Sequence, residues 1–200
     1  MKGWKNFVYS IVVHAVLIYS IYWNIAYRDV VQNCMAGQYS IEHRTELRQA
    51  IERYIQDNRS MSPGMAAGYT AMYVSAGKEF NVDPMLLAVV GKFESGFDPS
   101  IVSYTGAIGL QQIMPFWVKA IPFLNTQEDL YNPELNIKAS AYILSHYREL
   151  CGDTIASMAA CYHGGPRAIL HPKVSTQKFK KAVSYAFYAM KASTTYDSSI

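Results

Sequence analysis

Apolar residues recur at helical spacing along most of this chain. Beyond residue 65 the periodic segments cover about residues 66–79, 84–94, 113–121, 135–150, 153–162 and 176–192. No alternating strand pattern of comparable strength, internal repeat or low-complexity tract accompanies them. We therefore expect an all-α domain over residues 66–193, followed by a tail at 194–200.

A different pattern precedes this domain, because residues 7–27 form a run of 21 residues without a formal charge. Such a run is long enough to cross a bilayer as a helix. Lys2 and Lys5 precede it, and tryptophans and tyrosines lie near its ends, which is typical of a cytoplasmic N-terminus with interfacial anchors. We expect a single-pass inner-membrane anchor over residues 1–28, with the remainder of the chain facing the periplasm and cell wall.

Two alternatives to an anchor stay open. A cleaved signal peptide competes, although the apolar run exceeds the usual length of about 7 to 15 residues and no Ala-x-Ala site follows promptly. A buried helix of a soluble domain is the other alternative.

Residues 29–65 are expected to form a juxtamembrane helix and a linker. Residues 41–55 are amphipathic and predict either a helical stalk or a packed prefix, and residues 57–64 break the pattern.

Composition narrows the function classes. Half of the residues are hydrophobic, which argues for a folded domain, and the net charge of +3 is too small to indicate nucleic-acid binding. The histidines show no metal-ligand spacing with one another or with the cysteines, so we expect no metal and no cofactor. Cys151 and Cys161 can bridge in an oxidising compartment or remain buried thiols, while Cys34 can pair with a second chain.

The strongest chemical candidate is Glu94. Asp83 and Pro84 supply an N-cap and a first-turn proline for a helix that Gly96 ends, which places Glu94 in its last turn. The negative end of the helix dipole disfavours a carboxylate there, and burial adds to that effect, so both raise the pKa of the group. A carboxyl that keeps its proton near neutral pH can act as a general acid. The plainer interpretation is a surface glutamate at a helix end.

Further stretches give Glu94 a context. They are Glu94-Ser95 with Ser103 and Gly109–Pro115, then Asp129–Leu144, Ala159–Pro166 and Ser175–Val183. In this order the stretches resemble the motifs of the soluble lytic transglycosylase (SLT) family of the lysozyme-like superfamily. The resemblance covers about residues 70–190. It implies a lysozyme-like, goose-type transglycosylase domain behind the predicted transmembrane helix.

The resemblance also implies a reaction that needs one acid. Glu94 would protonate the β-1,4 glycosidic oxygen between N-acetylmuramic acid and N-acetylglucosamine, and its carboxylate would then accept the proton of the muramoyl 6-hydroxyl. Attack by that hydroxyl gives a 1,6-anhydro product, and proximity on one ring makes the step feasible. Asp98, the acid nearby in sequence, is expected to cap a turn.

Supporting roles follow from the same motifs. Ser103 and Gln112 would contact the muramoyl sugar, and Met114 would lie along the cleft floor. Tyr162 would bond Glu94 and orient it. His163 stands where the motif has asparagine, and it would alter how the N-acetyl group is bound or add a pH dependence. The other departures from the family pattern are Gln111, Gly164, Ser175 and Phe179.

Two alternative functions stay open at this stage. One is a membrane-anchored wall-binding or assembly component of a secretion, conjugation or phage entry apparatus, which would be virion-associated in a phage. The other is a lysozyme-type hydrolase, because the choice between water and the 6-hydroxyl depends on cleft geometry. All of these hypotheses share peptidoglycan glycan strands as the partner.

Overall fold

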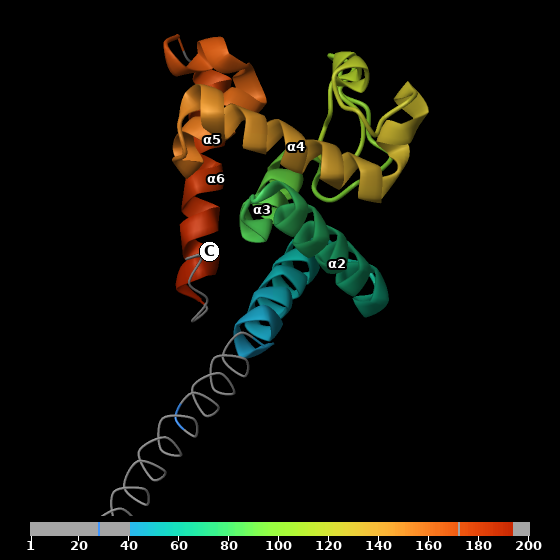
Figure 1. The fold of residues 1–200 in the computed structure, drawn as a ribbon, viewed down its shortest axis with the longest axis vertical. Helices are drawn as coiled ribbons and strands as arrows, with labels where there is room; N and C mark the ends of the chain where they lie inside the picture. The colour runs from blue at the N-terminus through green and yellow to red at the C-terminus, as the bar shows by residue number, and fades with distance from the viewer. Residues whose placement is uncertain (1–27, 29–40, 172, 194–200) are drawn as a thin grey trace, which may run out of the picture. The chain divides into compact units, whose positions relative to one another are not determined.

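The computed structural model describes residue 28, residues 41–171 and residues 173–193. Residues 41–58 are helical. The later α-helices are α2 (Pro63–Phe80), α3 (Pro84–Ser95), α4 (Pro133–Cys151), α5 (Ile155–Gly164) and α6 (Val174–Ala192), with 3-10 helices η1 (Pro115–Lys119), η2 (Gln127–Tyr131) and η3 (Pro166–Ile169) (Figure 1).

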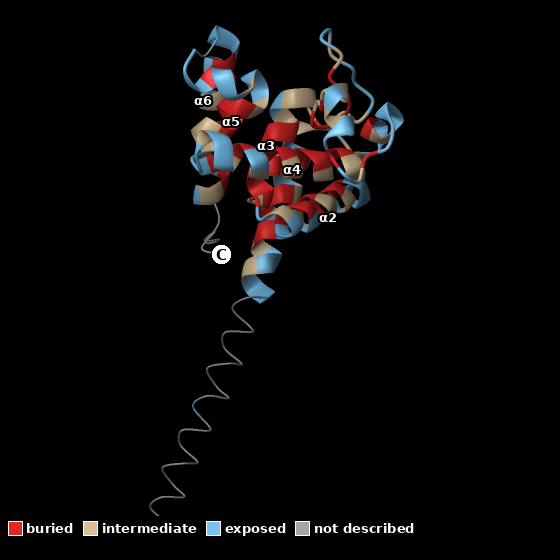
Figure 2. Cartoon of the chain, turned by 45° about the horizontal axis from the view of Figure 1, so that its top comes forward, coloured by how far each residue is buried: buried red, intermediate tan, exposed pale blue. Residues whose placement is uncertain are grey.

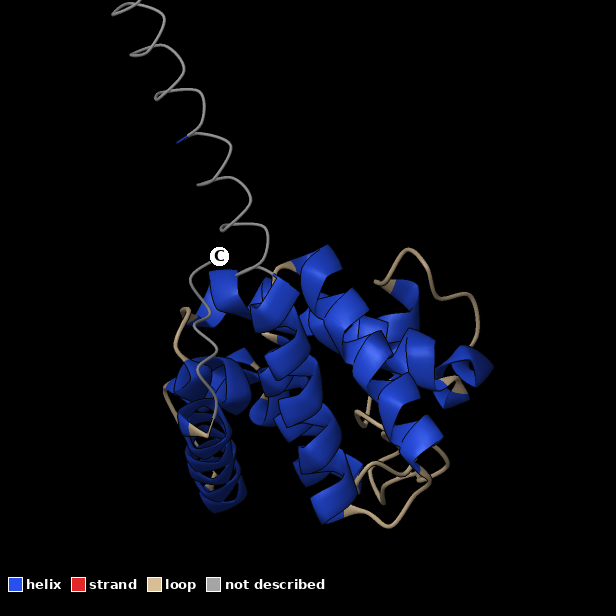
Figure 3. Cartoon of the chain, turned by 90° about the horizontal axis from the view of Figure 1, so that it is seen from below, coloured by secondary structure: helices blue, strands red, loops and turns tan. Residues whose placement is uncertain are grey.

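No β-strand occurs among the described residues (Figure 3). Isolated bridges join Val102 to Ile108 and Ile108 to Ile113 within the loop between α3 and α4. The all-α class expected from the periodicity is therefore confirmed over this part of the chain.

Local sequence sets where the helices begin and end. Ser62, Asp83 and Asn132 each cap the helix that follows, accepting hydrogen bonds from its first backbone N–H groups, and a proline comes next in all three cases. Gly96, with φ of 62°, ends α3 in the left-handed conformation that glycine adopts readily. The boundaries of α3 predicted from the sequence are confirmed.

The core gathers around α3, whose residues from Pro84 to Gly91 are all buried. Helix α2 packs against α3 and α4, while α6 packs against α3 and α5. Figure 2 shows the buried residues concentrated on α3 and α4. The fully buried part of α3 therefore ends at Gly91, just before the last turn that carries Glu94.

The segment before α2 also contributes to this core. Leu47, Ile51 and Ile55 are buried in the same cluster as α3, and the compact unit begins at Thr45. Of the two hypotheses for residues 41–55, the packed prefix is confirmed for residues 45–55. The apolar face of this helix is thus covered by the rest of the unit.

Two other expectations concern the helix at residues 113–121 and the membrane anchor. Residues 113–121 were expected to form a helix, but they contain only η1, because Ile113 pairs with Ile108 and Pro115 restricts the backbone that follows. The predicted anchor lies outside the described residues. Among those that are described, no helix is long and apolar enough to cross a membrane.

A disulfide joins Cys151, the last residue of α4, to Cys161 in α5. Of the alternatives left open for these two cysteines, the structure has the bridge. It ties the end of α4 to the turn of α5 that carries Tyr162 and His163.

Candidate active site

Glu94 lies in the last turn of α3, as expected from the sequence. The chain then turns sharply, since both Gly96 and Phe97 have positive φ values, of 62° and 65°. A left-handed conformation is unfavourable for an aromatic residue, and full burial of the Phe97 side chain offsets this cost. The turn leads directly into the loop between α3 and α4.

The Glu94 side chain is only 14% exposed. Burial raises the pKa of its carboxyl because the charged form loses hydration, while the neighbouring His163 acts in the opposite direction. The net direction is upward. Glu94 therefore has the property required of a general acid, a proton that it keeps to higher pH than a solvated carboxyl does.

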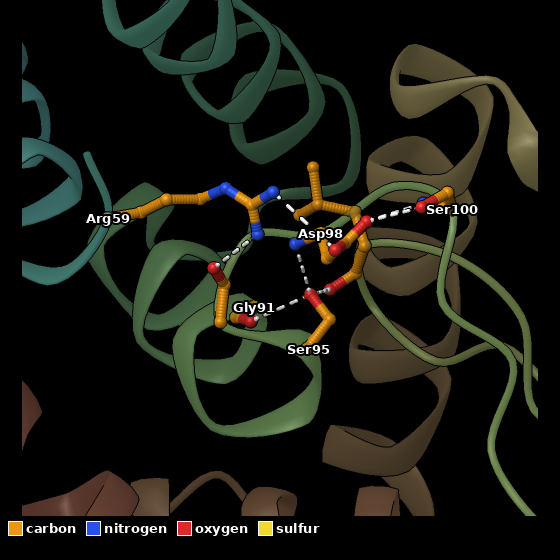
Figure 4. A network of polar contacts seen from close by, with 7 residues as sticks. Arg59, Gly91, Ser95, Asp98 and Ser100 are labelled. Atoms are coloured by element: carbon orange, nitrogen blue, oxygen red, sulfur yellow. Dashed lines mark hydrogen bonds and ion pairs between the residues drawn. The ribbon is translucent and has the colours of Figure 1, made fainter. Parts of the chain in front are cut away.

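Ser95 connects the end of α3 to the following loop. Its hydroxyl donates to the backbone oxygen of Leu110 at 2.7 Å and accepts from the backbone N–H of Asp98 at 3.0 Å; Gly91 O lies 3.3 Å away (Figure 4). Ser95 thus supports the helix end by bonding backbone groups. These contacts fix the backbone on the C-terminal side of Glu94.

Asp98 belongs to the turn and not to a second acid position. Its carboxylate accepts from the backbone N–H and hydroxyl of Ser100 at 2.9 and 2.7 Å, and Arg59 lies 3.5 Å away (Figure 4). The bonds from Ser100 hold the pKa of Asp98 below its usual value. The turn-capping prediction for Asp98 is confirmed. A carboxylate held ionised in this way is a poor proton donor.

Gln111 is a fully buried side chain in the loop. Its amide nitrogen lies 3.1 Å from both the Tyr73 hydroxyl and the Leu87 carbonyl, and its amide oxygen accepts from the Ser140 hydroxyl at 3.3 Å. Its backbone carbonyl accepts from Tyr162. The loop is thus bound to α2, α3, α4 and α5 through one residue. Sequence reasoning noted Gln111 only as a departure from the family pattern; an amide where the family has an apolar side chain was the available signal.

Asn136, at the start of α4, holds the same loop. Its buried side chain accepts from the Gln111 backbone N–H at 2.7 Å and donates to the carbonyls of Ile108 and Leu130 at 3.0 and 2.7 Å. A Cβ on Gly109 would lie 2.5 Å from Leu130 O and 2.6 Å from the Asn136 amide, and Gly109 has a φ of 78°. The loop therefore requires glycine at residue 109.

Tyr162 lies near Glu94 but bonds elsewhere. Its hydroxyl donates to the Gln111 carbonyl at 2.8 Å, and the direct bond to Glu94 expected from the sequence stays a prediction. Because the single phenolic proton is given to this carbonyl, the phenol oxygen could bond Glu94 only as an acceptor. Burial raises the pKa of Tyr162 well above its usual value, and the Glu94 charge adds to this, so the phenol stays neutral.

His163 faces Glu94 directly. Its Nδ1 atom lies 3.8 Å from Glu94 Oε1, beyond hydrogen-bonding distance but close enough for a strong charge interaction. The imidazole also stacks on Phe179 of α6, with ring centroids 4.5 Å apart and planes inclined by 15°. Sequence reasoning noted both residues as departures from the family pattern. Their contact was not visible because they belong to different helices.

The other sequence candidates lie in the loop that follows Glu94. Ser103 accepts from the backbone N–H of Ala107 at 2.9 Å. The Gln112 amide donates to the Gly109 carbonyl at 2.9 Å, and Gln112 itself has a φ of 51°. Met114 is half-buried before η1. Ser103 and Gln112 thus have a structural part in the loop, and their contacts with a sugar stay a prediction.

The described residues contain no group of histidine, cysteine and acidic side chains that could hold a metal ion. A cavity of about 560 Å³ lies between the helix at residues 41–58, α3 and α6, with Tyr54, Phe93 and Met190 in its wall. Glu94 does not line it. The polar and titratable groups gather instead where α3, the loop and α5 meet.

Comparison with known proteins gives these residues a family context. The family model described as Transglycosylase SLT domain matches residues 72–184, more than half of the chain. A curated relative, the transglycosylase of Enterobacteria phage PRD1, is 36% identical over 91 residues, which are 46% of this chain and 32% of the relative.

A second relative is the membrane-bound lytic murein transglycosylase C of Glaesserella parasuis, which is 29% identical over 119 residues, 52% of this chain and 33% of the relative. The chain thus spans about a third of the length of these relatives. Among solved structures, the 70 kDa soluble lytic transglycosylase of Escherichia coli matches 75% of this chain and 29% of its own, with 18% identity and a TM-score of 0.57. That last likeness supports the fold alone.

Proposed function

Since the chain belongs to the transglycosylase SLT domain family, we propose that it is a peptidoglycan lytic transglycosylase. The bond cleaved is the β-1,4 linkage between N-acetylmuramic acid and N-acetylglucosamine, and the product is a 1,6-anhydromuramoyl end. The observation that carries this proposal is the Glu94 carboxyl, mostly buried at the end of α3 with a raised pKa.

Glu94 performs both proton transfers. The protonated carboxyl donates to the glycosidic oxygen as that bond breaks, and the resulting carboxylate accepts the proton of the muramoyl 6-hydroxyl as its oxygen attacks C1. Because the nucleophile is part of the substrate, neither water nor a second carboxylate takes part. The engagement of Asp98 with Ser100 is consistent with this single-acid chemistry.

The loop after α3 supplies the sugar contacts in this proposal. Ser103 and Gln112 hydrogen-bond the muramoyl residue, and Met114 lies under a sugar ring. Tyr162 links α5 to the loop through the Gln111 carbonyl and so keeps both in place beside Glu94. His163 borders the site on the α5 side, beside the carboxyl.

The location in the cell is part of the proposal. An anchor over residues 1–28 would keep the domain next to the wall, for local remodelling during secretion, conjugation or phage entry. The relatives named as a membrane-bound murein transglycosylase and as a phage transglycosylase support a protein that acts on the cell wall.

The test is to incubate the full chain with purified peptidoglycan and to identify the soluble muropeptides by mass. We expect anhydromuramoyl ends, which are lighter by one water than hydrated reducing ends, and their loss in Glu94→Gln. The matched control is Glu149→Gln, since Glu149 also lies in the last turn of a helix but is exposed. It should release as much product as the wild type.

Other outcomes decide against the proposal in specific ways. Hydrated reducing ends would indicate a lysozyme-type hydrolase. Binding to peptidoglycan without release of muropeptides would favour the wall-binding component. Equal release by wild type and Glu94→Gln would remove Glu94 from the chemistry.

A further inference from the structure

Three departures from the family pattern meet at one place, the packing of α5 on α6. His163 stacks on Phe179, with ring centroids 4.5 Å apart. A Cβ on the adjacent Gly164 would lie 2.8 Å from the hydroxyl oxygen of Thr176 and 2.7 Å from the Ala168 Cβ. The absence of a side chain at residue 164 therefore permits the close approach that brings the imidazole onto the Phe179 ring.

Further contacts hold Phe179 in place. Its ring meets Phe93 of α3 edge to face, with centroids 6.4 Å apart, and the Phe179 side chain is 9% exposed. Phe93 directly precedes Glu94 in the chain. The imidazole thus rests on an apolar surface that is itself fixed to the helix of the catalytic acid.

The edge of the imidazole faces the Glu94 carboxyl. His163 Nδ1 is 3.8 Å from Glu94 Oε1, and the two side chains are 32% and 14% exposed. Partial burial lowers the effective dielectric constant between them, so a charge on one strongly affects the other.

Among the described residues, His163 is the charged neighbour that acts on the Glu94 carboxyl. On α5, the titratable neighbour Tyr162 is neutral and gives its proton to the Gln111 carbonyl. On α6, the residue stacked on the ring is the uncharged Phe179. On α3, Glu94 faces the ring, while Lys92 is directed to the Asn58 carbonyl at 3.3 Å.

We propose that His163, held against Phe179, is a positioning residue whose charge sets the pH range in which Glu94 keeps its catalytic proton. The proposal rests on the proposed function of Glu94. When the imidazole is protonated it stabilises the carboxylate, and Glu94 gives up its proton at lower pH. When the imidazole is neutral or absent, burial dominates and Glu94 keeps the proton to higher pH.

The test is the pH dependence of kcat/KM for release of anhydromuropeptides by the full chain. In His163→Asn we expect the alkaline limb to move to higher pH by on the order of one unit, the lower end of the effect of an opposite charge within a few ångströms. His146→Asn, the same change at an exposed histidine of α4, should leave the limb in place. A limb that stays in place in His163→Asn would overturn the proposal.

A second variant tests the stacking. Phe179→Leu keeps an apolar side chain but removes the aromatic ring, so the imidazole is no longer held facing Glu94. We expect the alkaline limb to move in the same direction as in His163→Asn, and His163→Asn to add little in the Phe179→Leu background. Full additivity of the two shifts would contradict the role given to Phe179.

A measurement that needs no turnover separates this proposal from the proposed function. Carbon-13 NMR follows the titration of the Glu94 carboxyl in protein labelled at glutamate, with Glu94→Gln assigning the signal. The midpoint should be higher in His163→Asn than in wild type, whether or not the protein cleaves peptidoglycan. An unchanged midpoint would refute the coupling of the two groups, and a missing anhydro product would refute only the enzymatic function.

Discussion

Replacing Gln111 by methionine should destabilise the domain, although methionine has a similar size and is apolar. In the wild type the Gln111 amide contacts Tyr73, Leu87 and Ser140 in the buried core. A thioether cannot satisfy these partners. The substitution leaves polar groups buried without their hydrogen bonds while the volume of the core hardly changes.

The size of the effect follows from those contacts. Each buried hydrogen bond contributes about 1 kcal/mol net, so the loss of these three predicts about 3 kcal/mol in the free energy of unfolding. For a chain of this length each kcal/mol lowers Tm by roughly 2–4 °C, which gives a decrease of roughly 6–12 °C. Urea unfolding of the full chain, followed by circular dichroism, measures the change.

The control is Gln56→Met, the same substitution at an exposed helical residue. It should change stability by no more than about 0.5 kcal/mol. The double variant Gln111→Met with Tyr73→Phe should lose less than the sum of the single variants, because it removes both partners of one bond. If Gln111→Met were as stable as Gln56→Met, the buried network would not hold the loop as argued.

Further predictions concern the α5 region and the turn after α3. Gly164→Ala should destabilise the domain by about 1–3 kcal/mol, because the added Cβ would overlap neighbouring atoms. Gly68→Ala, in open space within α2, should stabilise the domain by about 0.5–1 kcal/mol. Thermal unfolding measures both changes. Replacing Cys151 and Cys161 together by serine should cost about 2–4 kcal/mol, measured by urea unfolding with and without reductant, and equal stability would contradict a closed bridge. Asp98→Asn should leave anhydro product release unchanged. Since the folded pKa of Asp98 is lowered, its contribution to stability is present at neutral pH and lost as pH falls through that value, so the variant should show a shallower loss of stability in acid.

The sequence predicted those features that depend on neighbours along the chain. Asp83, Pro84 and Gly96 set the ends of α3, since capping and left-handed turns involve only adjacent residues. Helical periodicity gave the all-α class. The position of Glu94 in the last turn followed from the same local signals, and the turn-capping part of Asp98 followed from the proline after it.

The contacts between separate helices could not be predicted from the sequence. Periodicity shows which face of a helix is apolar, but it does not show which other helix covers that face. The burial of Ile51 and Ile55 in the common core was therefore only one of two hypotheses, and the bridge from Cys151 to Cys161 was one alternative among several.

The neighbours of Glu94, the proposed acid, were decided in the same way. Tyr162 gives its proton to the Gln111 carbonyl, which belongs to a loop distant from α5 in the chain. His163 meets Phe179 only because α5 and α6 pack closely at Gly164. The sequence by itself determined that Glu94 lies in the last turn of α3, since that depends on local chain geometry. Only the tertiary structure decided what surrounds the acid, because those contacts arise when helices distant in the chain exclude water together.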